Sequence, residues 1–204
     1  MPAVSGDEVR CEDGSAEAFG CESVDLLAFV PTADLGSARG VNVNDIWGWT
    51  DPQTGSEYAI VGRTDGTSFV DITDTYSPNY LGDLPMTTGS RTSIWRDMKV
   101  YQDHVYIVAD NALEHGMQVF DLTQLRTLRN VPVTFNETFR YTGINSAHNI
   151  VINEETGFGY AVGSSGGGET CGGGLHMINL ENPARPTFAG CFADATTGRR
   201  LTGY

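Results

Sequence analysis

Gly66-Thr-Ser-Phe-Val-Asp71-Ile72 is the first of three related phrases in this chain, and their repetition decides the fold. Each phrase has a glycine, two variable residues, two apolar residues, an Asp or Asn, and then an Ile or Leu. The other two read Gly116-Met-Gln-Val-Phe-Asp121-Leu122 and Gly174-Leu-His-Met-Ile-Asn179-Leu180. Upstream landmarks recur with them, because Asp45-Ile46, Asp97-Met98 and Asn149-Ile150 lie 52 residues apart. A period near 50 residues, built of short strands, is typical of β-propeller blades or a related β-repeat array.

Four short strands separated by turns are expected in each repeat unit. The units run over about 43–84, 95–135 and 147–192, with the last strand of the second at Val131–Phe135. Residues 1–23 are polar and irregular, and Val24–Val30 is expected to form a strand. The predicted fold class is therefore all-β, with residues 24–204 forming a partial β-propeller of about three four-stranded blades.

Three blades are too few for a closed ring, since propellers have about four to eight. The chain is then a fragment of a larger propeller, or it associates with a second copy that completes the ring, or it stays open. The expected partners are accordingly the remaining blades or a second copy, together with an unknown extracellular ligand or protein.

The charge of the chain excludes two classes of partner. Of 204 residues, 26 are acidic and only 12 are Lys or Arg, so the net charge is −14. Nucleic acid and anionic membrane surfaces both require a basic patch, and neither is expected as a partner. No run approaches the roughly 18 apolar residues of a membrane span. The N-terminus shows no visible export signal, which leaves open whether one is absent or removed.

The four cysteines form two local pairs, Cys11 with Cys21 and Cys171 with Cys191. Four cysteines allow three connectivities, and we favour these two local disulfides over free thiols in a reducing cytosol. A zinc site is disfavoured because no C-x-x-C occurs. Disulfides indicate an oxidising compartment, which predicts an extracellular or cell-surface location.

Several longer stretches resemble the choice-of-anchor B family, whose repeats are called LVIVD repeats. They are Asp45-Ile-Trp-Gly-Trp49, Trp95-Arg-Asp-Met-Lys99, His115-Gly-Met-Gln-Val-Phe-Asp121, Ala147-His-Asn-Ile150, Asn153-Glu-Glu-Thr-Gly157 and Leu175-His-Met-Ile178. The resemblance covers about Cys11 to Tyr204 and implies the N-terminal part of a secreted or surface-anchored β-propeller of unestablished activity. Family members continue with further repeats past the position equivalent to Tyr204.

The residues that open the repeats are the main candidates for function. The innermost strands of propeller blades line the axis, so Asp45, Asp97 and Asn149 should lie near one another. The other members of the predicted ligand-binding set are Trp47, Trp49, Arg96 and His148. Asp45, Asp97 and His148 are a candidate site for a divalent cation such as calcium. The alternative is that these polar groups satisfy backbone groups between blades.

Other polar and aromatic residues have a structural interpretation beside a functional one. Asp71, Asp121 and Asn179 each begin a turn and are expected to bond backbone amides two residues on, with calcium at Asp71 and Asp74 as the alternative. The three tryptophans, Trp47, Trp49 and Trp95, either form a sugar- or ligand-stacking surface or fill the core between blades, and we expect core for one or two of them. Neither a G-x-S-x-G elbow nor an H-E-x-x-H pair is present.

Three functions remain open. The first is a non-enzymatic extracellular binding module of unknown specificity. The second is a metal-dependent hydrolase that uses the polar ring at the axis. The third is a structural surface scaffold whose polar residues only hold the blades together.

Overall fold

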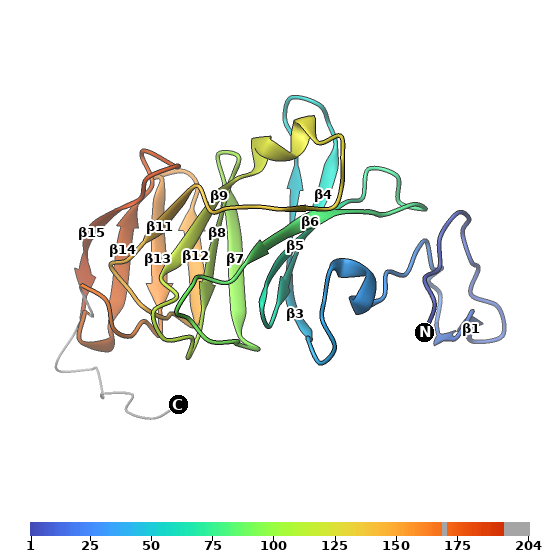
Figure 1. Cartoon of the computed structure of the whole chain (residues 1–204), viewed down its shortest axis with the longest axis horizontal. Helices are drawn as coiled ribbons and strands as arrows, with labels where there is room; N and C mark the ends of the chain where they lie inside the picture. The colour runs from blue at the N-terminus through green and yellow to red at the C-terminus, as the bar shows by residue number, and fades with distance from the viewer. Residues whose placement is uncertain (169–170, 194–204) are drawn as a thin grey trace.

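The computed structural model of the protein describes residues 1–168 and 171–193. Within them the fold is all-β, as predicted, with four sheets and short 3-10 helices. Three large sheets follow one another along the chain and along the long axis of the molecule (Figure 1). In each of these sheets the first strand of the unit lies at one edge. Neighbouring strands are antiparallel except for one pair.

The bounds of the strands follow the order of the chain. The first sheet contains β3 (Val43–Thr50), β4 (Glu57–Arg63), β5 (Gly66–Asp71), β6 (Asn79–Pro85) and, out of sequence, β10 (Val133–Thr134). The second contains β7 (Arg96–Tyr101), β8 (His104–Ala109), β9 (Met117–Asp121) and β11 (Phe139–Tyr141). The third contains β12 (Asn149–Asn153), β13 (Phe158–Val162), β14 (Leu175–Asn179) and β15 (Thr187–Phe192).

The remaining elements are short. The N-terminal segment carries a hairpin of β1 (Ser15–Ala16) and β2 (Phe19–Gly20), followed by η1 (Thr32–Leu35). Two further 3-10 helices are η2 (Leu122–Thr127) and η3 (Cys171–Gly173). The N-terminal segment lies beside the first sheet, at the opposite end of the molecule from the third (Figure 1).

The core lies between the faces of consecutive sheets. Apolar side chains of the first two sheets meet in one cluster, in which Phe69 stacks on Phe120 with ring centroids 4.7 Å apart. The second and third sheets meet in another cluster that includes Tyr106 and Ile150, both fully buried. Both faces of the middle sheet are therefore covered, which explains why its strands read as continuous apolar runs in the sequence.

Two expectations about strands are wrong. The segment Val131–Phe135 does not close the second sheet, because β10 within it pairs in parallel with β6 of the first. Phe135 then packs edge-on against Phe69 and Phe120, so the returning chain adds to the core between the first two sheets. The residues Val24–Val30 make only isolated bridges, Leu26 with Val9 and Phe29 with Val4.

The first strands of the three units lie side by side, with β7 between β3 and β12. Polar side chains join these strands, although the strands belong to different sheets. The Asn44 amide donates to the carbonyl of Arg96 over 3.0 Å, and the Asp97 carboxylate accepts from the Ile150 amide over 2.7 Å. These contacts link positions about one repeat apart and hold the first strands of the three units next to one another.

Candidate functional site

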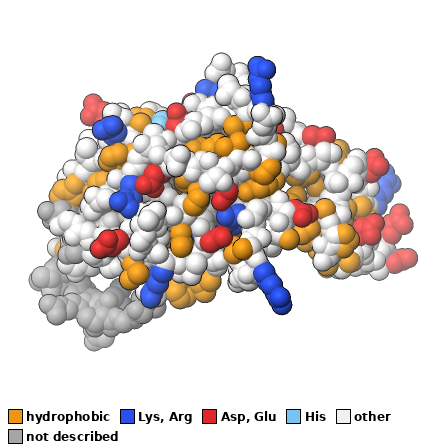
Figure 2. All heavy atoms as spheres, in the orientation of Figure 1, with side chains coloured by type: hydrophobic (Ala, Val, Ile, Leu, Met, Phe, Trp, Pro, Cys, Tyr) orange, Lys and Arg blue, Asp and Glu red, His pale blue; other side chains and the backbone are white. Residues whose placement is uncertain are grey.

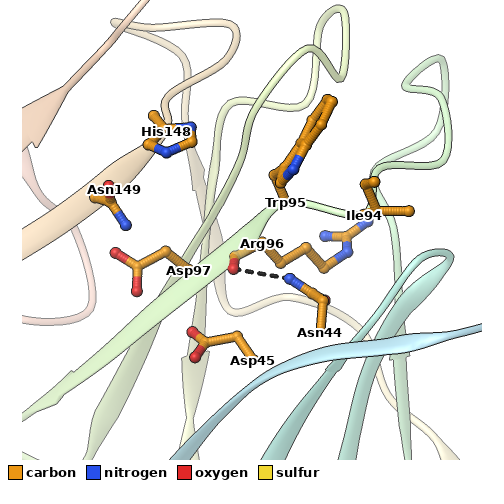
Figure 3. A pocket seen from close by; sticks show the side chains of 8 residues that line it. All are labelled: Asn44, Asp45, Ile94, Trp95, Arg96, Asp97, His148 and Asn149. Carbon is orange, nitrogen blue, oxygen red and sulfur yellow. Dashed lines mark hydrogen bonds between the residues drawn. The ribbon is translucent and has the colours of Figure 1, made fainter.

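A pocket of about 230 Å³ lies where the three inner strands meet (Figure 3). Residues of β3, β7 and β12, with the residues just before β7 and β12, form its wall. The lining residues are Asn44, Asp45, Ile94, Trp95, Arg96, Asp97, His148 and Asn149. The volume is below the 300–1,000 Å³ of pockets for drug-sized ligands, so a ligand of about one sugar ring is the size that fits.

The structure brings together five residues of the predicted ligand-binding set: Asp45, Arg96, Asp97, His148 and Asn149. Trp47 and Trp49 do not line the pocket. Trp49 is buried in the core, stacked on Tyr58, as we expected for one or two of the tryptophans. Trp47 is partly exposed beneath the ammonium group of Lys99, 4.3 Å from the ring centroid. Trp95, half exposed at the rim, is the tryptophan that faces the pocket.

Asp97 is engaged on both carboxylate oxygens. One accepts from the Lys99 ammonium group at 2.6 Å and the other from the Ile150 amide at 2.7 Å. The side chain is buried, so the charge is held by one cation and one backbone donor. This arrangement agrees with the structural interpretation, in which a polar residue at the start of a repeat unit forms a hydrogen bond to a backbone group of the next sheet.

Arg96 is buried behind the pocket, with 3% of its surface exposed. Its Nε donates to the carbonyl of Arg63 over 2.6 Å, and Nη1 lies 2.8 Å from Nε2 of His115. Nδ1 of His115 is 3.0 Å from the carbonyl of Gly116. Because a carbonyl only accepts, Nδ1 carries the proton and Nε2 accepts from the guanidinium. Burial, and next the charge of Arg96, lower the pKa of His115 to about 4, so this ring is neutral at pH 7.

Asp45 carries an incompletely bonded carboxylate. Its Oδ2 atom is buried and has no hydrogen-bond partner among the described residues. Burial raises the pKa of Asp45, against the effect of the Ile46 amide, and the nearby Asp97 carboxylate raises it further. An acceptor of this kind favours a ligand that brings a hydroxyl or ammonium donor.

His148 lies at the mouth of the pocket and is exposed. Its Nδ1 is 2.8 Å from Oδ2 of Asp110, which orients the ring. An imidazole oriented by a carboxylate can accept a proton, and a hydrolase would also need a nucleophile or a metal-bound water beside it.

The three residues predicted to hold a cation are not arranged as ligands. Asp97 is bonded to Lys99, His148 to Asp110, and the described residues contain no group of three or more His, Cys, Asp or Glu side chains that could hold a metal ion. The metal site at Asp45, Asp97 and His148 thus stays a prediction from the sequence.

The second set of repeated polar residues forms three equivalent turns. The Oδ1 atoms of Asp71, Asp121 and Asn179 accept from amides two residues on, at 2.9, 2.9 and 2.7 Å. The predicted turn geometry is confirmed. In the same loop as Asp71, Oδ1 of Asp74 likewise accepts from the Tyr76 amide. The Asp or Asn of the repeated sequence therefore forms a turn at the end of a strand.

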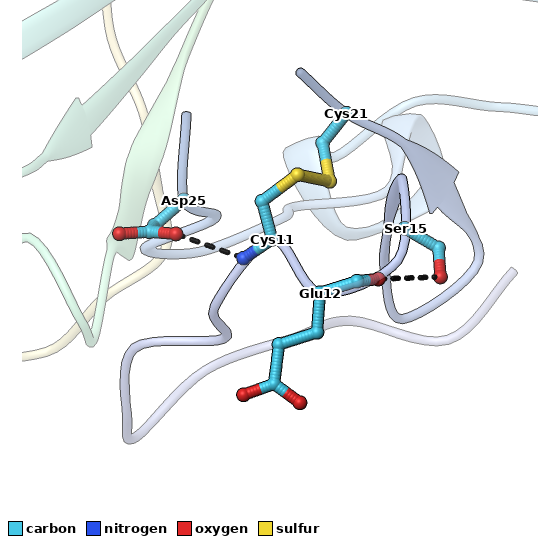
Figure 4. Close-up of a disulfide and its surroundings, with 5 residues drawn as sticks. All are labelled: Cys11, Glu12, Ser15, Cys21 and Asp25. Carbon is cyan, nitrogen blue, oxygen red and sulfur yellow. Dashed lines mark hydrogen bonds between the residues drawn. A yellow bond between two sulfur atoms is a disulfide. The ribbon is translucent and has the colours of Figure 1, made fainter. Parts of the chain in front are cut away.

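Both favoured disulfides are present. Cys11 joins Cys21, and Cys171 joins Cys191. The first lies in the N-terminal segment, where the Cys11 amide donates to Asp25 (Figure 4). Disulfides persist in oxidising surroundings, so the fold is suited to such a compartment. In Figure 2 acidic side chains gather on the end of the molecule formed by this segment.

No protein-family model matches the chain, and no curated protein matches it significantly. Over the described residues, no helix is long and apolar enough to cross a membrane.

Proposed function

We propose that this chain is a non-enzymatic ligand-binding module, built as part of a β-propeller and working outside the cell or on its surface. Membership of the choice-of-anchor B family belongs to the same proposal and is supported by the resemblance of its repeats. The observation that carries the binding function is the pocket lined by all three inner strands.

The end faces of the sheet stack support the propeller part of the proposal. In the middle sheet, Tyr106 and Val108 are fully buried against the third sheet. The repeat-equivalent residues of the third sheet are Tyr160 and Val162 on β13, the strand that pairs with the inner strand β12. Val162 is 37% exposed there, and Val151 beside it on β12 is 54% exposed. This face has the apolar pattern that receives another sheet elsewhere in the fold.

At the other end of the stack, the inner strand of the first sheet exposes the side that meets a preceding sheet in the other two units. Ile46 is 61% exposed, whereas its repeat equivalents Met98 and Ile150 are fully buried against a preceding sheet. A shallow groove of about 470 Å³ runs beside it, lined by Ile46, Trp47, Gly48, Tyr58, Ala59 and Ile72. Further blades, or those of a second copy, are the partners that such faces fit.

A structural scaffold is the second candidate function, because a specific observation favours it. The side chains of Asn44 and Asp97 form hydrogen bonds to backbone groups of neighbouring strands. A scaffold needs these bonds but does not need Trp95 half exposed at the rim of a pocket, and this difference separates the two functions.

The test is binding by the pocket itself. The wild type is screened by calorimetry against monosaccharides, sugar acids, amino acids and calcium chloride, each at up to 10 mM, a range that we set by the roughly millimolar affinity of weak small ligands. Trp95→Ala should weaken any binding by about tenfold or more, since a stacked aromatic is lost. Trp47→Ala is the matched control, because Trp47 is also partly exposed but does not line the pocket. Absence of binding across the panel would favour the scaffold.

A further inference from the structure

Two polar atoms are orphaned beneath the surface of the pocket. They are Nη2 of Arg96 and Oδ2 of Asp45, both buried and both without a hydrogen-bond partner among the described residues. Buried polar groups are nearly always bonded, so each unbonded one calls for an explanation. One of the two atoms is a donor and the other an acceptor, and both belong to residues that line the same pocket.

Arg96 also has no direct ion pair among the described residues. Within the part of the chain that the structure describes, no carboxylate lies within 4.0 Å of its guanidinium. Asp65 stabilises the charge of Arg96 only at longer range, because its carboxylate is bonded to Arg63. Asp97, in the same pocket, is bonded to Lys99. Its partner His115 is the neutral acceptor described above. A buried cation without a counter-ion is costly, and an anion in the pocket would lower that cost.

We propose that the pocket binds the carboxylate of a small sugar acid, with Arg96 as the anion-binding group and Asp45 as the acceptor for a ligand hydroxyl. This inference rests on the proposed binding function and names its ligand class. A monocarboxylate fits better than a phosphate, because Asp45 and Asp97 in the same wall repel a second negative charge. A single sugar ring matches the volume of the pocket, and its apolar face matches the exposed ring of Trp95.

Access to the guanidinium requires a small movement. In Figure 3 the Arg96 side chain runs beneath Trp95 toward Ile94. Both of these side chains are about half exposed, Ile94 at 53% and Trp95 at 49%. Exposed side chains change rotamer on the picosecond to nanosecond timescale, so these two form a gate that a ligand carboxylate passes to reach Nη2.

The test compares matched ligands on the unaltered protein. D-Galacturonate, its uncharged methyl ester and D-galactose are titrated into the wild type by calorimetry, and D-glucuronate and D-glucose form a second set. We expect each acid to bind at least about tenfold more tightly than its neutral counterparts, because the extra contact is a charge-assisted hydrogen bond. The advantage should shrink as sodium chloride is raised.

Variants assign the effect to the two residues. Arg96→Gln should abolish the preference for the acid, and Asp45→Asn should weaken acid and neutral sugar alike. Since Arg96 also holds the Arg63 carbonyl and His115, its variant is used only if its circular dichroism matches the wild type, and the ester comparison otherwise decides.

Equal affinity for acid and ester would overturn the sugar-acid proposal while leaving the binding module intact. Failure of every sugar and sugar acid, with another panel compound bound, would do the same. Failure of the whole panel would remove the binding function as well.

Discussion

Asp97→Ala should uncouple the second sheet from the third. In the wild type, the Asp97 carboxylate accepts from the buried Ile150 amide at 2.7 Å, and it also binds Lys99. Removing it leaves that amide without an acceptor. Hydrogen bonds to charged groups contribute about 1.5–3 kcal/mol, and a partly exposed ion pair adds at most about 1 kcal/mol. We expect a loss of about 3 kcal/mol in the free energy of unfolding.

The assay is urea unfolding followed by circular dichroism, with thermal unfolding beside it. For a chain of this size each kcal/mol moves Tm by about 2–4 °C, so the expected fall is about 6–12 °C. Asp97→Asn keeps an acceptor oxygen and should lose only about 1 kcal/mol. Asn149→Ala, at the exposed neighbour of Ile150, should stay within about 0.5 kcal/mol. If Asp97→Ala is as stable as Asn149→Ala, the carboxylate does not join the sheets and our reasoning is refuted.

Three further perturbations test other parts of the fold. Replacing Cys171 and Cys191 by Ser removes a link across 20 residues and should cost about 3 kcal/mol in urea unfolding. As the pH falls from 6.5 to 4, the wild type should lose about 3 kcal/mol of stability that His115→Gln does not lose. The reason is that burial lowers the pKa of His115 to about 4 in the folded state, so the unfolded chain takes up the proton first. Gly82→Ala should cost more than about 2 kcal/mol, because its Cβ would overlap the Val133 carbonyl and the φ of +144° favours glycine; hydrogen exchange should show β10 released.

Each of these has an outcome that would contradict it. A Cys-to-Ser double variant that unfolds at the wild-type urea concentration would mean that the bridge does not constrain the unfolded chain. Parallel pH profiles for wild type and His115→Gln would mean that the ring is not buried neutral. Unchanged protection of β10 in Gly82→Ala would mean that the strand does not pair with β6.

The all-β fold and the inner strands of the three units were readable from the sequence because the signals are local. The 52-residue spacing places Asp45, Asp97 and Asn149 at equivalent points of three inner strands, and alternating apolar residues with glycine turns define the strands around them. The Asx turns at Asp71, Asp121 and Asn179 depend only on residues two positions away, so the pattern alone predicts them.

The parallel pairing of β10 was not readable, because it depends on distant parts of the chain. Val133 reaches β6 only because Gly82 leaves room for its carbonyl, and Phe135 then packs edge-on against both Phe69 and Phe120. A two-residue strand carries no periodic signal of its own. The same limit applies to Val24–Val30, whose apolar residues bridge the N-terminal segment and join no sheet.

The site was partly readable for a related reason. The repeat register brings Asp45, Asp97 and Asn149 together, and their neighbours Arg96 and His148 follow with them. The groups that set their chemistry come from elsewhere. Asp110 orients His148, and His115 takes one donor of Arg96, and neither contact has a signal in the spacing. Trp47 and Trp49 looked equivalent to Trp95 in composition, but only the tertiary packing separates a buried indole from an exposed one.

If a ligand occupies the pocket beside Trp95, the indole N–H resonances of the three tryptophans will report it. They are assigned in ¹⁵N-labelled protein by single Trp→Phe variants and followed as D-galacturonate is added. We predict that the Trp95 resonance shifts in a saturable way, whereas the buried Trp49 resonance stays fixed. A Trp95 resonance that does not move while galacturonate binds by calorimetry, or a shift confined to Trp47 or Trp49, would contradict it.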